Sequence, residues 1–412
     1  MFEDKIKKLL TKIPHSPETP NLTNKFLERV DEQIQFDISQ GINAETAQNN
    51  ISILLKELEN LINQAADSQN SAVMLKQLEK SIIQILELKS VNEFTVNLAN
   101  ITELHFNYRI GDLIILPTKG DQLIVKDLMS RDIPKLYSTI EKVGNVVKIT
   151  QGPRKLVGLF KNKILLFVPD NYASFLTVRS QSGKVTLIGL SSHCMLDLTN
   201  ISGRVLLSNL KVKRFQADLK SSNLLMTNCF SQNWHINSQS GKIKAEAINC
   251  SNTEQAMLIT TSSGSIDLTN ITGQAIQINN KSGNLHLDQI NSNTEITTNS
   301  GNIKFANIIK KTDIVTHSGN CKLSLNSKFQ DTINVKNISG NIHLKLASES
   351  FPMRFNAETN LGRINLPMDT IIYASDNFNI MKGYLNQEDA PALAVLKSDV
   401  GHIDVTTLIT KK

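Results

Sequence analysis

The stretch Ser182-Gly183-Lys184-Val185-Thr186-Leu187 decides the fold, because its pattern returns throughout the rest of the chain. The pattern is Ser-Gly, a polar residue, and two apolar residues one position apart. It recurs every 18 to 23 residues, with corner glycines at Gly183, Gly203, Gly241, Gly264, Gly283, Gly301, Gly319, Gly340, Gly362 and Gly401. Ser222 stands where one further glycine is expected. A fixed period in this range is typical of stacked structural units.

Each repeat predicts two short strands, and each strand carries a pair of inward residues. The second and fourth residues after the glycine are apolar in every row, as are Val185 and Leu187 in the first. The residue five positions before the next glycine is also apolar in every row, and the one seven before is apolar in most. This alternation is that of strands with one buried face. The glycine then falls at the corner between strands, where a positive φ or a close backbone approach is required.

Two assemblies fit two short strands per repeat: antiparallel hairpins, or a solenoid in which like strands stack in parallel. The near-constant residue type at each position favours the solenoid, because stacking places Val185, Val205 and Leu224 in one continuous apolar column. We therefore predict a mainly β protein. Its core is a parallel β-helix, or β-solenoid, of about 20-residue two-strand coils, preceded by a small α-helical N-terminal module.

The chain predicts three parts. Residues 1–90 read as the α-helical module, residues 91–180 as an irregular β lead-in that caps the solenoid, and residues 181–412 as the repeats. An insertion at residues 367–395 interrupts the repeats before Gly401, and we expect it to cover the other end. Caps are needed because a bare solenoid end exposes its core and its unpaired backbone.

Apolar stripes at helical spacing divide the N-terminal module into candidate helices. One is predicted over residues 21–40, a second begins at Asn43, and a third begins at Ser71. The stripes fit packing within a small bundle, or self-association with a partner helix.

Charge is unevenly placed along the 412 residues, whose net charge is +6. Residues 1–95 carry −4 and the remainder +10. A basic β region could meet an anionic surface such as teichoic acid, lipid headgroups or nucleic acid, but outward lysines also keep a stacked sheet soluble. The densest cluster is Lys211, Lys213 and Arg214, without interleaved aromatics, so we expect no nucleic-acid partner.

The cysteines, the N-terminus and the hydropathy give expectations about compartment. Cys194, Cys229, Cys250 and Cys321 lie at different positions within their repeats, which predicts small buried fillers and not disulfides or a metal site. The N-terminus has no apolar signal core, and no run of 18 apolar residues predicts a transmembrane segment. We expect a cytoplasmic protein, with the cell surface, reached without a signal peptide, as the alternative.

Candidate catalytic side chains are scattered. Parallel β-helices that cleave polysaccharides need clustered carboxylates. The outward acids Asp267 and Asp404, three positions after their glycines, belong to rows far apart in sequence. His286 and His343 share that position but are three rows apart. We therefore predict no catalytic, cofactor-binding or metal-binding residues and no cofactor.

Asparagines follow four of the corner glycines, and we expect their side chains to form an amide ladder along one edge of the stacked coils. They are Asn284, Asn302, Asn320 and Asn341. A ridge that binds a ligand is the alternative interpretation.

The chain resembles the DUF4097 family of bacterial β-strand-repeat proteins, which are often labelled as adhesins. The resemblance covers about residues 92–405 and rests on Gly111-Asp112-Leu113-Ile114-Ile115, on Lys163-Ile164-Leu165-Leu166-Phe167-Val168-Pro169, and on the serial Ser-Gly-x-Ile-x-Leu rows. It implies a β-helix or roll, offers no catalytic residues, and includes members similar to Lia-type envelope-stress surface proteins. The family's usual Asp after Ser-Gly is replaced here by Lys, Arg, Ser or Asn, so an acidic, cation-binding corner is not carried over.

The sequence favours a non-enzymatic bacterial scaffold whose solenoid surface meets a protein or cell-envelope partner, with a link to envelope-stress regulation. The N-terminal helices would mediate assembly or regulation. One alternative is a cytoplasmic β-helix scaffold that assembles with itself, and another is a carbohydrate-active β-helix enzyme. Neither the ligand nor the oligomeric state follows from the sequence.

Overall fold

The computed structural model describes residues 3–10, 88–129, 132–152, 161–191, 193–250, 256–376 and 379–407, and the single residues 27, 30, 48, 52, 55 and 59. The chain divides into two compact units. The first comprises Met1–Cys194 and Asn209–Lys211, and the second comprises Met195–Ser208 and Val212–Lys412. The predicted division at residue 180 therefore falls inside the first unit.

Helix α1 (Glu3–Leu10) is the one complete α-helix among the described residues. It lies within the predicted α-helical module of residues 1–90, but outside the individual helices predicted there. Its Ile6 and Leu9 are buried. The remaining helical residues that the structure describes are Leu27, Val30, Gln48, Ser52, Leu55 and Glu59. Apart from these, the helices predicted over residues 21–40 and from Asn43 lie outside the described residues. So does the helix predicted to begin at Ser71, except for its last apolar residue, Leu88, which lies directly before the strand Lys89–Asn97 and not in a helix.

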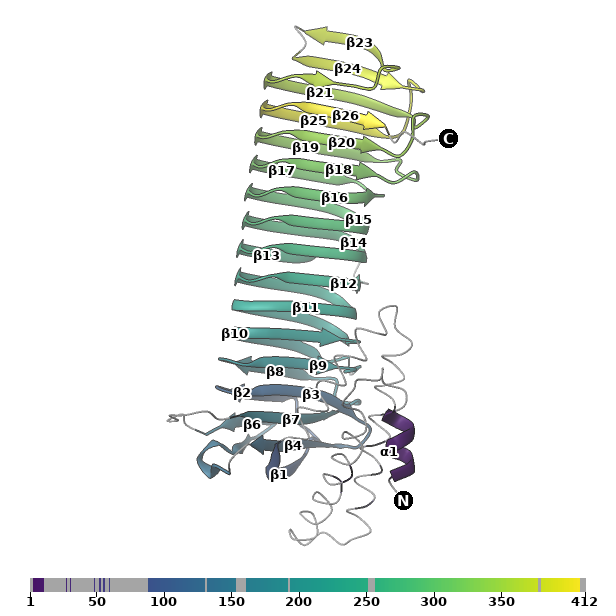
Figure 1. Ribbon diagram of the computed structural model, residues 1–412. Helices are drawn as coiled ribbons and strands as arrows, with labels where there is room; N and C mark the ends of the chain where they lie inside the picture. Colours follow the sequence, from purple (N-terminus) through teal and green to yellow (C-terminus); the bar gives the residue numbers. More distant parts are fainter. Residues whose placement is uncertain are drawn as a thin grey trace. The chain divides into compact units, whose positions relative to one another are not determined.

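The first unit holds a sheet of parallel and antiparallel strands (Figure 1). Its strands are β1 (Lys89–Asn97), β2 (Glu103–Tyr108), β3 (Asp112–Thr118), β4 (Gln122–Met129), β5 (Ser138–Val143), β6 (Val146–Gln151), β7 (Asn162–Pro169), β8 (Phe175–Ser180) and β9 (Lys184–Ile188). Strand β4 runs antiparallel to β1 and β7, and β5 runs antiparallel to β6. By contrast, β2 pairs in parallel with β6 and β8, and β3 pairs in parallel with β7 and β9.

Strands β2 and β3 form a regular coil, which corrects the expectation that residues 91–180 are irregular throughout. Leu113 and Ile115 of β3 are the register partners of Val185 and Leu187 of β9, the first recognised repeat. Gly111 is the corner of this coil, with φ +97°. The sequence pattern missed the coil because no Ser precedes its glycine and because β4 to β7 separate it along the chain from the next repeat.

Strands β3 and β7 carry buried apolar residues on both faces, whereas a solenoid strand has one solvent-exposed face. All eight residues of β7 are buried. On one face of these strands, Ile114, Leu165 and Phe167 pack with Leu88 and Leu128. Such continuous apolar runs are typical of strands with elements on both sides.

The second unit is the solenoid (Figure 1). Its strands are β10 (Met195–Ser208), β11 (Lys211–Ser240), β12 (Ile243–Cys250), β13 (Met257–Ser263), β14 (Ile266–Ser282), β15 (Leu285–Ser300), β16 (Ile303–Ile308), β17 (Thr312–Ser318), β18 (Cys321–Leu325), β19 (Thr332–Ser339), β20 (Ile342–Leu346), β21 (Met353–Leu361), β22 (Ile364–Asn365), β23 (Ile371–Asp376), β24 (Ile380–Leu385), β25 (Leu393–Val400) and β26 (Ile403–Thr407). Like residues stack in parallel register: Val205 lies opposite Leu224, Leu224 opposite Ile243, and Ile243 opposite Ile266. These registers confirm the predicted solenoid and exclude hairpins for these strands.

A third apolar column, which the two-strand prediction lacked, follows a second corner in the coils from Gly203 to Gly301. In these coils the residue six positions after the first corner has a positive φ, for example 52° at Asn228 and 55° at Asn270. The next residue points inward, so that Cys229, Ile248 and Ile271 form successive register partners. Asparagine adopts this left-handed conformation more readily than other residues with a side chain, and its recurrence at this position was the available signal.

The last repeats do not stack in sequence order. Strands β25 and β26, which carry the Gly401 corner, lie between the coil of β19 and β20 and the coil of β21 and β22 (Figure 1). Leu396 is therefore the register partner of both Val335 and Ala357. The sequence prediction had placed the Gly362 coil before the Gly401 coil. The insertion supplies β23 and β24, and β24 pairs antiparallel with β21 beyond the final coil.

Candidate functional site

The corner glycines bring backbone of successive coils into contact. Gly264 has φ +138°, and a Cβ on it would collide with the carbonyl oxygen of Gly241 in the preceding coil. The other predicted corners with a positive φ are Gly183, Gly203, Gly241, Gly283, Gly301, Gly319, Gly340 and Gly401. Gly362 is not among the residues with positive φ, but a Cβ there would collide with the carbonyl oxygen of Gly401. The glycines are thus required by close approach as well as by conformation.

The serine before the glycine ties its coil to the preceding one. Its hydroxyl donates to the backbone carbonyl oxygen of the residue two positions before the preceding corner. Ser240 reaches Lys220 at 3.2 Å, Ser282 reaches Ser262 at 3.2 Å, and Ser182 reaches Arg109 at 2.9 Å. The recurring Ser-Gly pairs are therefore structural corners and not catalytic serines on nucleophile turns.

A buried polar column lies three residues before the corners, and the sequence reasoning missed it. Its members are Ser180, Asn200, Ser238, Thr261, Asn280, Thr298, Thr316, Asn337, Thr359 and Ser398, all at most 5% exposed. Apart from Asn200, these side chains donate to carbonyl oxygens at a corner: Thr298 donates to Ser300 at 3.2 Å and Asn337 to Gly319 at 2.9 Å. These bonds give additional hydrogen-bond donors to backbone oxygens at the turn. The recurrence of Ser, Thr or Asn at this position was the signal.

The asparagine after the glycine builds a ladder, although the bonds join side chain to backbone and not amide to amide. The Oδ1 of Asn284 accepts from the backbone N–H of Asn302 at 3.0 Å, and Asn302 accepts from Asn320 at 3.0 Å. Asn320 accepts from Asn341 at 2.9 Å, and Asn341 accepts from His402 at 2.9 Å. Asp112 makes the same bond to Lys184 in the first unit.

Ser222 replaces a corner glycine without a positive φ. Its hydroxyl donates to Asn200, to the side-chain Oδ1 and to the backbone oxygen 3.3 Å away. Ser222 and Asn200 are both buried. At the one corner that lacks a glycine, a side-chain hydrogen bond therefore links the coil to the preceding coil.

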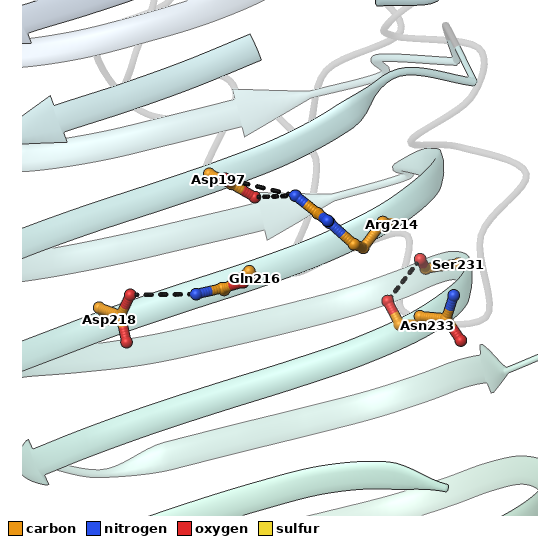
Figure 2. A network of polar contacts seen from close by, with 6 residues as sticks. All are labelled: Asp197, Arg214, Gln216, Asp218, Ser231 and Asn233. Carbon is orange, nitrogen blue, oxygen red and sulfur yellow. Dashed lines mark hydrogen bonds and ion pairs between the residues drawn. The ribbon is translucent and has the colours of Figure 1, made fainter. Parts of the chain in front are cut away.

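The outer face of β10 and β11 carries polar contacts between and along coils (Figure 2). Arg214 donates to Asp197 at 3.1 Å, and Gln216 donates to Asp218 at 3.4 Å. Arg214 belongs to the densest basic cluster of the sequence, so part of that cluster is neutralised within the coil stack. An exposed pair of this kind contributes about 0–1 kcal/mol to stability.

A buried network in the first unit joins four strands. Asp127 of β4 accepts from the backbone N–H and the hydroxyl of Ser138, each at 2.6 Å, and from the side chain of Asn92 at 2.8 Å. The hydroxyl of Tyr108 lies 3.1 Å from that of Ser138. Burial raises the pKa of Asp127 above its ordinary value, although the donated hydrogen bonds act in the opposite direction. The network therefore ties β1, β2, β4 and β5 together through one buried carboxylate, which accepts the hydrogen of the Ser138 hydroxyl.

The structure brings the four candidate catalytic side chains together as two Asp–His neighbours. Asp267 pairs with Lys242 at 3.3 Å and with His286 at 3.6 Å. Since the Gly401 coil follows the Gly340 coil in space, His343 is the register partner of Asp404. No group of three or more potential metal ligands occurs among the described residues.

All four cysteines are buried, and none of them forms a disulfide bond. Burial raises the pKa of the Cys321 thiol to about 12. A thiol with so high a pKa is a poor nucleophile, because the thiolate is the reactive form. The cysteines therefore fill space, as the sequence predicted.

The part of the chain that the structure describes contains no helix long and apolar enough to cross a membrane. No protein of curated function matches the chain. A solved structure from Clostridium sporogenes ATCC 15579, described as a candidate cell adhesion protein, is 12% identical; the match covers 78% of this chain and 99% of that chain, with a TM-score of 0.19. At that score the likeness supports no inference.

The family comparison is decisive, because it covers most of the repeats. The model of the family described as Toastrack DUF4097 matches residues 101–304 and residues 254–382, which overlap and together span more than half of the chain. The match begins before β2 and continues through β23, so it includes the regular coil of the first unit and the solenoid strands β10 to β23. The chain therefore belongs to the Toastrack DUF4097 family.

Proposed function

We propose that the protein is a non-enzymatic binding scaffold whose solenoid presents its outward columns to a protein or cell-envelope partner. One observation carries this proposal: the residues that repeat are used inside the coil stack. Gly, Ser, the buried polar column and the asparagine ladder all bond to the neighbouring coil or their own corner. The outward positions vary from coil to coil, as in Asp267, His286 and Lys304.

We further propose that the partner belongs to the cell envelope and that the protein takes part in envelope-stress regulation, with the N-terminal module in assembly or control. The family and the sequence resemblance to Lia-type proteins support this role. Fractionation of cells, with the protein detected by antibody, distinguishes the cytoplasm from the cell surface.

The test combines a deletion strain with a binding assay. We expect the strain to become more sensitive to agents that damage the envelope, and we expect the purified full chain to bind isolated envelopes more than cytosolic extract. Normal growth under envelope stress, together with no preference for envelopes, would contradict the proposal.

Self-assembly is a second candidate, because strand β23 presents an apolar edge. Ile371, Ile372 and Tyr373 are 55%, 46% and 64% exposed, and β23 pairs only with β24 among the described strands. An exposed edge without lysine or proline is a template for pairing with another chain. Light scattering should then show a mass that rises with concentration, and Tyr373→Lys should abolish the rise. A monomer at high concentration would remove this candidate.

A further inference from the structure

Four consecutive coils of the solenoid present two columns of polar side chains on one outward face. The first column is Asn284, Asn302, Asn320 and Asn341, one residue after the corners. The second is His286, Lys304, Lys322 and His343, three residues after the corners, and these are direct register partners. Positions two apart on a strand lie on the same face, and neighbouring strands are about 4.8 Å apart. We call these eight residues the donor grid.

The asparagines of the donor grid are held with their amide hydrogens outward. Each Oδ1 accepts from the backbone N–H of the coil that follows, at 2.9 to 3.0 Å. The Nδ2 group therefore lies on the far side of each amide from this bond. Within the described part of the chain, no protein acceptor takes the Nδ2 hydrogens of these four side chains. The column is thus a row of oriented donors.

The lysines of the donor grid are exposed and have no ion pair with any described residue. The next outward residues on their strands are Ala306 and Ser324, which carry no charge. On this face, Asp267 lies opposite His286 and Asp404 lies opposite His343, while Asp288, two residues after His286, accepts from the side chain of Asn307 at 2.7 Å. Like charges placed directly opposite each other on adjacent strands are unfavourable. An anion that bridges Lys304 and Lys322 would relieve this repulsion.

We propose that the donor grid binds a linear acidic polysaccharide that carries a carboxylate on its successive sugars, with the polymer running along the direction in which the coils stack. The ammonium groups would contact the carboxylates, and the amide hydrogens would contact carboxylate and hydroxyl oxygens. Repeated donors, about one strand spacing apart, suit a polymer better than a single small anion. The inference rests on the proposed function and names the ligand class of the envelope partner.

Other polyanions fit the donor grid less well. Single-stranded nucleic acid is bound through aromatic side chains on which bases stack, and the grid has no aromatic residue other than two histidines at its ends. Recognition of an anionic membrane surface typically uses clusters of four to eight Lys or Arg, whereas the grid has two lysines, with Lys345 beside His343. The alternation of neutral amides and charges favours an acidic sugar polymer.

The experiment is calorimetric titration of the purified full chain with sodium polygalacturonate, with dextran as the neutral polymer. We expect binding to polygalacturonate that weakens as salt rises, and no binding to dextran. The variant Lys304→Gln/Lys322→Gln should lower the affinity by roughly tenfold and reduce the slope against salt. The matched control Lys242→Gln/Lys244→Gln removes the same charge beside Asp267 and Glu246, and should lower the affinity by less than about twofold.

A second variant separates the binding role of the asparagines from their structural role. Asn302→Asp/Asn320→Asp keeps the oxygen that accepts the backbone N–H, but replaces the outward donor with a negative charge. We expect the thermal midpoint to stay close to that of the parent, while the affinity for polygalacturonate falls as far as in the lysine variant.

Several results would overturn the inference. They are an equal loss of affinity in the two lysine variants, binding of poly(glycerol phosphate), RNA or anionic vesicles that is tighter than binding of polygalacturonate, or no binding of polygalacturonate at all. If the chain binds envelopes but not polygalacturonate, this inference fails and the proposed function stands. If it binds neither, both fail.

Discussion

Val335 and Leu396 are direct register partners in a parallel pair, although 61 residues separate them along the chain. Ala357, which comes between them in sequence, lies on the other side of Leu396. The C-terminal coil is therefore inserted between two coils that precede it in the sequence. This order decides what happens when the C-terminus is lost.

Truncation after Ala392 removes β25 and β26 and leaves the coil of β19 and β20 without its neighbour. We expect loss of cooperative unfolding and a tendency to aggregate, because two apolar columns and two strand ladders become open at once. Circular dichroism during heating, with size-exclusion chromatography, measures both effects. Truncation after Thr407 keeps every described strand and is the control. The same midpoint in both truncations would contradict the insertion of this coil.

Gly283→Ala should destabilise the protein by about 3 kcal/mol or more, because it combines an unfavourable φ of +122° with a collision against the carbonyl oxygen of Gly264. Gly144 also has a positive φ, +57°, but open space surrounds its Cβ position. Gly144→Ala should therefore cost only about 1–2 kcal/mol. Urea unfolding of both variants measures the difference, and equal costs would show that the close approach between coils is unimportant.

Thr298→Val tests the buried polar column. The hydroxyl of Thr298 donates to the backbone oxygen of Ser300, and valine has nearly the same shape without this donor. We expect a loss of about 0.5–1.5 kcal/mol, because the carbonyl oxygen of Ser300 loses one of its two hydrogen bonds and keeps only the one from the backbone N–H of Gly283. The neighbouring Thr297 is exposed, and Thr297→Val should change stability by less than about 0.5 kcal/mol. If the two valine variants unfold alike, the column does not stabilise the corners.

Asp127 predicts a pH dependence of stability. Because burial raises its pKa in the folded state, the folded protein holds this proton at a pH where the unfolded chain has lost it. Stability from this group is then highest below the ordinary pKa of aspartate, and falls as the pH rises through the raised value. Asp127→Asn removes the titration, so its stability relative to the parent should improve from pH 4 to pH 7.

Thermal midpoints at a series of pH values measure this trend. The exposed Asp121 hydrogen-bonds only to Asn171 among the described residues, and Asp121→Asn is the matched control. A parent and an Asp127→Asn variant whose midpoints stay a constant distance apart across this range would show that burial does not govern this carboxyl group.

The candidate surface was only partly predictable. The sequence indicated that Asn302 and Asn320 would align, because they share one offset from the corner. It did not indicate which of their atoms would remain available, since that depends on the backbone N–H of the next coil. The sequence also did not indicate whether Lys304 and Lys322 would lie beside acidic side chains. Their neighbours on the outward face belong to other coils, so the neighbours depend on the order in which the coils stack.

The N-terminal half shows the same limit for the fold. The motif that begins at Ser182 could be interpreted from the sequence because local rules specify it. Glycine is required at a crowded corner, and alternation of apolar and polar residues is required in a half-buried strand. The coil of β2 and β3 obeys those rules at Gly111, yet it stacks on β9 after a detour of about 70 residues. Periodicity detects repeats that follow one another in sequence. It does not detect a coil that is separated from the next coil by other strands.

The sequence by itself determined the parallel coils, their apolar columns and their glycine corners. The residue type at each fixed distance from the corner glycine recurs, because each coil must offer its neighbour the same shape and the same hydrogen bonds. The order of the coils at the C-terminal end, and the placing of His343 beside Asp404, were decided only in three dimensions. The ends of all coils offer nearly the same surface for the next coil. The pattern within a coil therefore does not set the stacking order, which depends on which coils the connecting segments can span.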